Sequence, residues 1–131
     1  IEINEKKGQP TTTRCIHLAG DTVIEERLGN LVFSISPLAF FQTNTAQAVT
    51  LYEQVKHLCT INASSTVLDL YCGTGTIGLY VAQTGCQLIG IEENDAAILN
   101  ARDNAAKNNI TNATFITGRV KNILKFMVLS M

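Results

Sequence analysis

The sequence has no tryptophan, only two prolines and a formal net charge of -1 over its 131 residues. A domain that binds nucleic acid through its phosphates is usually visibly basic, so this chain lacks that electrostatic signature. No stretch of eighteen apolar residues occurs and no secretory signal is present, which argues against a membrane-spanning helix and against secretion. Because the chain begins with Ile1, we expect a globular piece of a cytoplasmic protein with no membrane partner.

Patterns for metal binding and for disulfide frameworks are also absent. The four cysteines, Cys15, Cys59, Cys72 and Cys86, are scattered without CxxC spacing, and the two histidines form no cluster with them. A structural zinc site needs four clustered ligands, and small disulfide-bonded scaffolds are richer in cysteine. We predict reduced thiols, no metal site and non-catalytic histidines.

A glycine-rich loop between two apolar runs is the most informative feature. Residues 69–78 read DLYCGTGTIG, and an acidic pair beginning at Glu92 ends the next apolar run. Gly73 and Gly75 allow a tight turn close to a ligand, and Gly78 lets the following helix pack on a sheet. A carboxylate at the end of the next strand can accept hydrogen bonds from both hydroxyls of a ribose. The pattern predicts a nucleoside site with Glu92 as the ribose ligand.

Asp69, which precedes the glycines, distinguishes between the nucleoside ligands that such a loop can bind. Gly73 to Gly78 satisfy GxGxxG, which would suit NAD or FAD, but Asp69 stands four residues ahead of the first glycine. Its carboxylate would repel a pyrophosphate and would favour a ligand that carries an ammonium and a sulfonium group. S-adenosylmethionine is such a ligand and is our preferred cofactor. An NAD-dependent oxidoreductase and a non-catalytic nucleotide-binding or interaction module remain the alternatives.

The hydrophobic pattern changes near Pro37. Three short strand-like runs separated by turn pairs predict an antiparallel meander, after a linker over residues 1–9, with strands at 12–18, 22–28 and 31–35. Alternating elements follow, with helices at 45–59, 76–83, 95–108 and from about 120, and strands at 66–70, 87–91 and 113–117. This alternation predicts an α/β, Rossmann-like fold with three parallel strands. We place the domain boundary between residues 1–37 and 38–131.

The strand that carries the glycine loop usually lies in the middle of such a sheet. Its second neighbour is therefore expected from sequence beyond Met131, and one edge should be open. An exposed apolar edge promotes association. We predict that this edge either pairs with another copy of the chain or is covered by the C-terminal residues FMVLSM.

The stretch FSISPLAFFQTN, from Phe33 to Asn44, makes the pattern specific when it is combined with the glycine loop. Together they resemble the bacterial TrmA and RumA-type family of RNA uracil-5-methyltransferases, in which ISP-x-x-FFQ-x-N leads into the donor-binding domain. The resemblance runs from about Gly20 to Thr117. It implies a class I methyltransferase fold, S-adenosylmethionine as the cofactor, and transfer of a methyl group to carbon 5 of a uridine in tRNA or rRNA. Other parts of the parent protein would hold most of the RNA.

The resemblance also implies roles for individual residues. Gln42 is implied to contact the methionine portion of the donor, although an amide there could also cap a helix. Tyr71 is implied to line the donor site, Thr76 to present a small polar side chain to it or to cap its helix, and Glu92 to hold the ribose. Gly73 and Gly75 shape the loop.

The catalytic groups of this family are expected outside the chain. The family adds a cysteine thiolate to carbon 6 of uracil, transfers the methyl group to carbon 5, and then removes the carbon-5 proton with a base. Both groups lie in motifs that would follow Met131, and none of the four cysteines matches them. Cys72 fits a small buried residue instead. We expect this piece to bind the donor and to be inactive alone.

Overall fold

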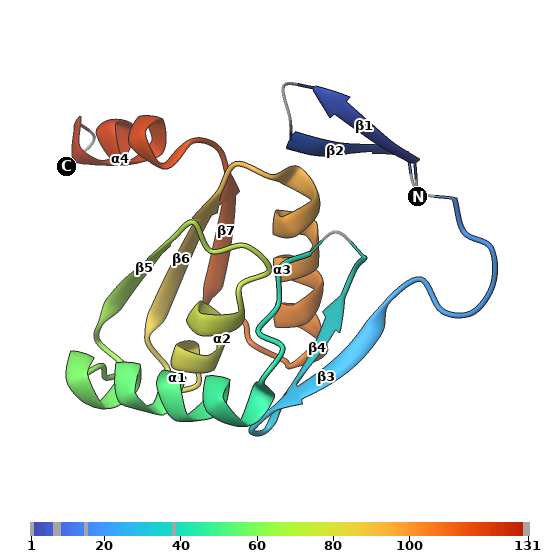
Figure 1. Cartoon of the computed structure of the whole chain (residues 1–131). Helices are drawn as coiled ribbons and strands as arrows, with labels where there is room; N and C mark the ends of the chain where they lie inside the picture. The colour runs from blue at the N-terminus through green and yellow to red at the C-terminus, as the bar shows by residue number, and fades with distance from the viewer. Residues whose placement is uncertain (1, 7–8, 15, 38, 130–131) are drawn as a thin grey trace.

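The computed structural model describes residues 2–6, 9–14, 16–37 and 39–129. The elements follow the order β1 (Glu2–Lys6), β2 (Gln9–Arg14), β3 (Ile24–Leu28), β4 (Leu31–Ile35), α1 (Thr45–Cys59), β5 (Thr66–Leu70), α2 (Thr76–Ala82), β6 (Gln87–Glu92), α3 (Asp95–Lys107), β7 (Ala113–Thr117) and α4 (Val120–Leu129). Strands β1–β2 and β3–β4 form antiparallel pairs, and β5, β6 and β7 form a parallel sheet in that order (Figure 1). The α/β, Rossmann-like class predicted from the sequence is confirmed.

The N-terminal part differs from the predicted meander. The linker predicted over residues 1–9 is wrong for the described residues, because β1 pairs with β2, while Ile1, Lys7 and Gly8 lie outside them. The first predicted strand, 12–18, is wrong beyond Arg14, since residues 16–23 form no strand. Polar residues dominate EINEK, so no apolar alternation marked β1 in the sequence.

The parallel sheet follows the prediction closely. Strands β5 and β7 have the predicted bounds, β6 runs one residue further, and α1, α2 and α3 end within one residue of theirs. Asn44 and Asn94 directly precede two of the predicted helices, where an asparagine is expected to cap the helix, and both do so. Asn44 Oδ1 accepts from the Gln47 N–H at 3.1 Å, and Asn94 Oδ1 accepts from the Ala96 N–H at 2.9 Å. Since all three strands run the same way, their carboxyl ends meet at one edge.

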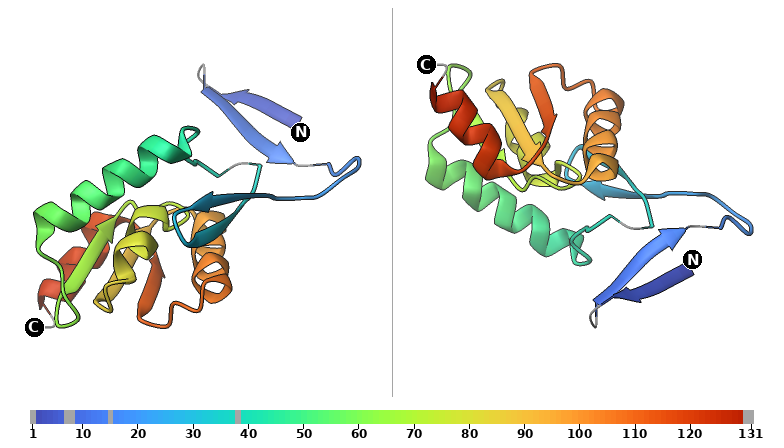
Figure 2. Two further views of the ribbon diagram at one scale, coloured as in Figure 1. Left: turned by 90° about the horizontal axis from the view of Figure 1, so that it is seen from below. Right: turned by 90° about the horizontal axis from the view of Figure 1, so that it is seen from above.

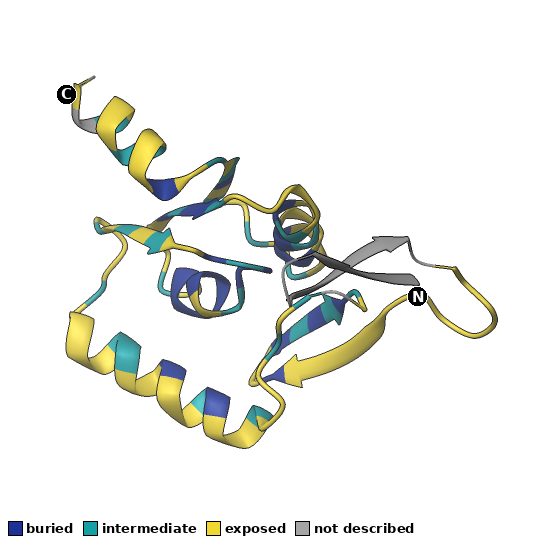
Figure 3. Cartoon of the chain, turned by 45° about the horizontal axis from the view of Figure 1, so that its top comes forward, coloured by how far each residue is buried: buried dark blue, intermediate teal, exposed yellow. Residues whose placement is uncertain are grey.

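Helix α2 is almost completely buried between the sheet and α1 (Figure 3). It approaches β5 and β6 closely because Gly78 has no side chain. A Cβ atom there would lie 2.7 Å from Asp69 Oδ2 and 2.9 Å from Leu88. Helix α1 lies alongside α2 and contacts β3 (Figure 2). The β3–β4 hairpin therefore packs on the same core as the parallel sheet, to which it contributes Leu28 and Phe33.

Side chains of helix α3 and its C-cap form hydrogen bonds with the backbone of β4. The Asn104 side chain is fully buried; its Oδ1 accepts from the Ser34 N–H at 2.8 Å, and its Nδ2 donates to the Ser34 carbonyl at 3.3 Å. One turn further, Asn108 Oδ1 accepts from the Val32 N–H at 2.8 Å and its Nδ2 donates to the Val32 carbonyl at 2.7 Å. Two side-chain amides thus satisfy the strand edge that β3 leaves unpaired.

The apolar spacing along the two helices predicts inward faces that are only partly correct. On α3 the spacing predicts Ile98, Ala101 and Ala105 inside, and all three are buried. On α1 the spacing predicts Leu51 and Leu58 inside, but they are 52% and 76% exposed. The α1 helix contacts α2 and β3 along a narrow stripe, so its other apolar residues have no cover within the described part of the chain.

The opposite face of the sheet is largely open. Leu68 and Leu70 of β5 are 44% and 39% exposed. Helix α4 contacts β6 and buries Val120. Part of the predicted covering tail forms the end of α4, and residues 130–131 lie outside the described residues. Among the described residues, no helix has the length and apolarity needed to cross a membrane.

Candidate functional site

The glycine loop joins β5 to α2 at the carboxyl edge of the sheet. The Cys72 N–H donates to the Ile91 carbonyl at 3.1 Å, and the Gly75 N–H donates to the Cys72 carbonyl at 2.8 Å, which closes a tight turn. Gly73 and Gly75 both have positive φ, 53° and 78°. A Cβ atom on Gly75 would also lie 3.0 Å from the Phe115 ring. Backbone conformation and space therefore both favour glycine at position 75.

Glu92 connects this loop to the start of α3. Its Oε2 accepts from the Gly73 N–H at 3.3 Å and its Oε1 accepts from the Asn94 N–H at 2.9 Å. Since an ionised carboxylate has about four acceptor positions, both oxygens can still accept hydrogen bonds from a diol. The neighbouring Glu93 pairs instead with Arg119 at 3.4 Å. The geometry thus assigns different surroundings to the two acids.

Asp69 lies beneath the loop, on the side covered by α2. Its Oδ2 accepts from the Gly78 N–H at 3.0 Å. Burial raises the pKa of Asp69 above its ordinary value of 3.8, and the hydrogen bond from Gly78 lowers the pKa by less. Burial therefore makes the charge of Asp69 less favourable than it would be in water. A positively charged ligand group near Asp69 would reverse that effect.

We expect Asp69→Asn to stabilise the unliganded chain at neutral pH. A carboxyl group with a raised folded-state pKa makes the fold less stable as the pH rises from about 3.8 through that pKa. The asparagine removes this penalty and keeps an oxygen for Gly78. Thermal unfolding across this pH range should give a higher melting temperature for the variant near neutrality and no difference at acidic pH. An equal gain at every pH would contradict a titration effect.

The loop residue Cys72 lies near both carboxylates. Burial, followed by the charges of Asp69 and Glu92, raises the pKa of the Cys72 thiol to about 12. A thiolate is needed for nucleophilic attack. The thiol is therefore inert near neutral pH, and the loop carries two nearby negative charges. This environment agrees with the prediction that Cys72 is a small buried residue.

Alkylation provides a direct check on Cys72. With iodoacetamide at about pH 8, the exposed Cys59 should be modified, whereas Cys72 should react only after unfolding. Mass spectrometry of the digested chain gives both rates in one sample. Modification of Cys72 in the folded chain as fast as that of Cys59 would contradict the assigned burial and charge.

Tyr71 stands at the outer side of the loop. It has positive φ, 62°, and its side chain is 74% exposed. Such a conformation is strained for an aromatic residue and is found most often at functional sites. Tyr71 lines a hollow of about 250 Å³ with Glu93, Arg119, Val120 and Lys121. Residues 119–121 were not predicted to line a site, although they directly follow β7 and so lie at the edge where ligands bind in such sheets.

Gln42 and Thr76 lie differently from the other predicted site residues. Gln42 lines a separate hollow of about 530 Å³ beside β3 and β4, and no residue of the glycine loop lines it. Thr76 hydrogen-bonds the buried hydroxyl of Tyr52, whose pKa is raised mainly by burial. Gly75 precedes α2 as its N-cap. The structure thus brings Asp69, Tyr71, Gly73, Gly75 and Glu92 together around one loop, with Thr76 turned toward α1 and Gln42 apart.

Comparisons with known proteins address the same region. A family model described as a methyltransferase domain matches residues 61–129, which include the loop, Glu92 and α4. An uncharacterized RNA methyltransferase of Chlorobaculum tepidum is 49% identical over 105 residues, covering 80% of this chain and 22% of the relative. The human tRNA (uracil-5-)-methyltransferase homolog B is 45% identical over 123 residues, covering 88% and 24%. The chain thus spans about a quarter or less of these relatives.

Solved structures agree with the fold. The tRNA (uracil-54, C5)-methyltransferase of Pyrococcus abyssi, in complex with S-adenosyl-L-homocysteine, has a TM-score of 0.68 and 39% identity, covering 76% of this chain and 24% of that one. A SAM-dependent methyltransferase from Agrobacterium tumefaciens has a TM-score of 0.69 at 18% identity, covering 86% and 37%. The second likeness concerns the fold alone.

Proposed function

The chain belongs to the methyltransferase domain family, and from that premise we propose that it forms the S-adenosylmethionine-binding part of an RNA uracil-5-methyltransferase. The RNA and tRNA methyltransferases among its relatives support this proposal, as does the agreement of Phe33 to Asn44 and the glycine loop with the same family. When bound, the donor supplies an electrophilic methyl group. The parent protein would transfer that group to carbon 5 of a uridine in tRNA or rRNA.

The observation that carries the cofactor assignment is the pair of carboxylates around the loop. Glu92 Oε2 accepts from the Gly73 N–H at 3.3 Å and Asp69 Oδ2 accepts from the Gly78 N–H at 3.0 Å, so both acids lie at the two ends of the same loop. Two negative charges would oppose a pyrophosphate and would favour the sulfonium and ammonium groups of the donor. Two cations, Arg119 and Lys121, line the hollow beside Tyr71, and Arg119 pairs with Glu93.

Within this site, different residues contact different parts of the donor. Glu92 accepts hydrogen bonds from the ribose hydroxyls, while Asp69 faces the charged methionine part. The space beside Gly73 is open, since a Cβ atom there would have no neighbour within 4 Å. Without a side chain at this position, the ligand can approach the backbone closely. Tyr71 covers the outer side of the nucleoside. We assign Gln42 to a contact with the methionine part of the donor. Thr76 is assigned to a contact beside that part.

The remaining predictions extend the same proposal. The nucleophilic cysteine, the base and most of the RNA contacts belong to other parts of the parent protein, which acts in the cytoplasm. The division near residue 37 separates a region before the donor domain from the donor domain itself. The free edge of β5 is proposed to pair with a second copy when this chain is isolated.

The donor assignment is tested by titrating the chain with S-adenosylhomocysteine in a calorimeter and, separately, with NADH by fluorescence. We expect binding of the first and none of the second. Binding of NADH alone would favour the oxidoreductase alternative, whose support is the GxGxxG spacing. For the RNA step, the full-length parent should transfer labelled methyl groups from S-adenosylmethionine to uridine-containing transcripts; no transfer would contradict the RNA assignment.

A further inference from the structure

Three asparagines follow one another at four-residue intervals along α3 and its C-cap: Asn100 and Asn104 lie in the helix, and Asn108 caps it. The last pairs with Val32, and Asn104 pairs with Ser34. A step of four residues toward the start of the helix thus corresponds to a step of two residues toward the end of β4. A turn of four helical residues rises about 6 Å and two strand residues about 6.7 Å, so the two repeats match. The next group in register with Asn100 is the backbone of Ser36.

Asn100 does not make this contact in the structure. Its Oδ1 is buried and has no hydrogen-bond partner among the described residues. The chain leaves the register at Ser36, whose carbonyl accepts from the Ala39 N–H at 3.0 Å, and Pro37 follows. A buried carbonyl oxygen without a partner is unfavourable. An arrangement that pairs this oxygen with the Ser36 N–H would therefore be favoured.

The segment that begins at Ser36 leads directly to Gln42. Ser36 and Gln42 both line the hollow of about 530 Å³ beside β3, whereas no residue of the glycine loop lines it. Glu92 contacts the start of α3, because the N–H of its N-cap, Asn94, donates to Glu92 Oε1 at 2.9 Å. One helix therefore contacts the proposed ribose ligand at its start and the strand leading to Gln42 along its length.

We propose that Asn100 is a positioning residue for Gln42. When the donor is bound, Asn100 Oδ1 accepts a hydrogen bond from the Ser36 N–H, extends the asparagine contacts of β4 by one step, and brings Gln42 toward the glycine loop. This inference rests on the proposed donor site. It assigns no chemistry to Asn100, which acts through the backbone of Ser36.

Hydrogen exchange of the Ser36 amide, with and without S-adenosylhomocysteine, tests the contact directly. In the unsubstituted chain the ligand should increase protection of this amide. In Asn100→Ala the increase should disappear and the affinity should fall about fivefold to tenfold, the effect of one hydrogen bond. Asn100→Asp, which keeps an acceptor oxygen, should restore the protection. Leu99→Ala, 57% exposed on the same helix, is the matched control and should change neither quantity.

The outcomes separate this inference from the proposed function. If the unsubstituted chain binds the ligand but Ser36 protection does not change, or if Asn100→Ala binds with unchanged affinity, the inference is overturned and the donor site stands. If the unsubstituted chain does not bind the ligand, the donor site and the inference fall together.

Discussion

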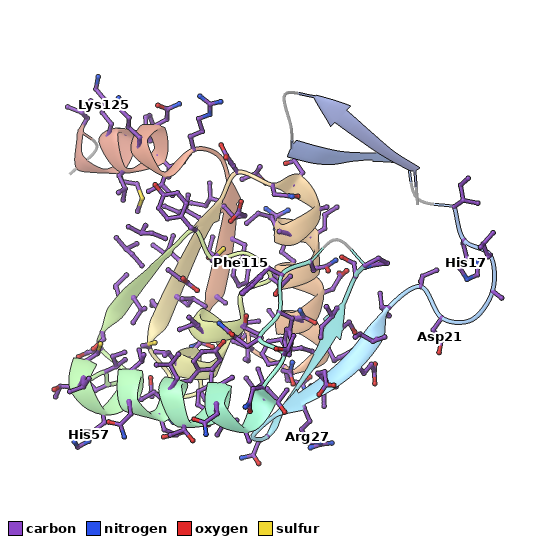
Figure 4. All side chains as sticks on the ribbon, in the orientation of Figure 1. His17, Asp21, Arg27, His57, Phe115 and Lys125 are labelled. Atoms are coloured by element: carbon purple, nitrogen blue, oxygen red, sulfur yellow. The ribbon has the colours of Figure 1, made fainter. Side chains whose placement is uncertain are left out.

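Gly90→Val should lower the free energy of unfolding by about 3 kcal/mol, the upper range for overpacking a core. Gly90 lies in the middle strand, β6, opposite Phe115 of β7. A Cβ atom at Gly90 would lie 2.5 Å from the Phe115 ring and 3.0 Å from Cys72 Sγ. Phe115, labelled in Figure 4, is 5% exposed and belongs to the buried core, so its ring has little space to move. Urea unfolding of the purified chain measures the loss.

The conflict with the ring can be tested separately from other effects of replacing a glycine. Gly90→Ala should lose less than Gly90→Val, since one methyl group is added and the unfolded chain loses some freedom. Combining Gly90→Ala with Phe115→Leu should give a smaller loss than the sum of the two single losses, because the smaller side chain leaves room. Strict additivity would show that Phe115 is not the group that excludes a side chain at position 90.

Asn104→Ala should lower the free energy of unfolding by about 2–4 kcal/mol, because it leaves the Ser34 N–H and carbonyl without partners. Both groups are satisfied by the fully buried Asn104 amide. The loss should appear mainly as faster exchange of the Ser34 amide together with a lower urea midpoint. Asp103→Ala, at an exposed position on the same helix, is the matched control and should change stability by no more than about 0.5 kcal/mol. A similar loss in both variants would contradict a special role for the amide.

Local signals explain which parts of this fold the sequence could predict. Asn44 and Asn94 cap helices through neighbouring residues, Gly85 follows α2 with a positive φ, and β-branched runs mark β5 and β7. The glycine loop and Glu92 could be linked because topology brings successive strand ends together. These features depend on residues close in sequence or on a general rule of parallel sheets.

Long-range partners explain the rest. No local pattern could mark Asn104 as a buried residue, because its partner in β4 lies 70 positions earlier. Thr76 could not be assigned to Tyr52, nor Arg119 to a hollow with Tyr71, without the packed structure. Leu51 and Leu58 fitted an inward stripe, yet the described chain provides nothing to cover them.

The pairing of Glu92 with a ribose is tested most directly by calorimetric titration of S-adenosylhomocysteine into three chains: unsubstituted, Glu92→Ala and Glu93→Ala. Hydrogen bonds to a charged group contribute about 1.5–3 kcal/mol, so Glu92→Ala should weaken binding at least tenfold. Glu93→Ala, whose carboxylate pairs with Arg119, should bind within about twofold of the unsubstituted chain, as expected for an exposed ion pair. Thermal unfolding of each chain verifies that it is folded. Equal affinity of Glu92→Ala and the unsubstituted chain would contradict the site.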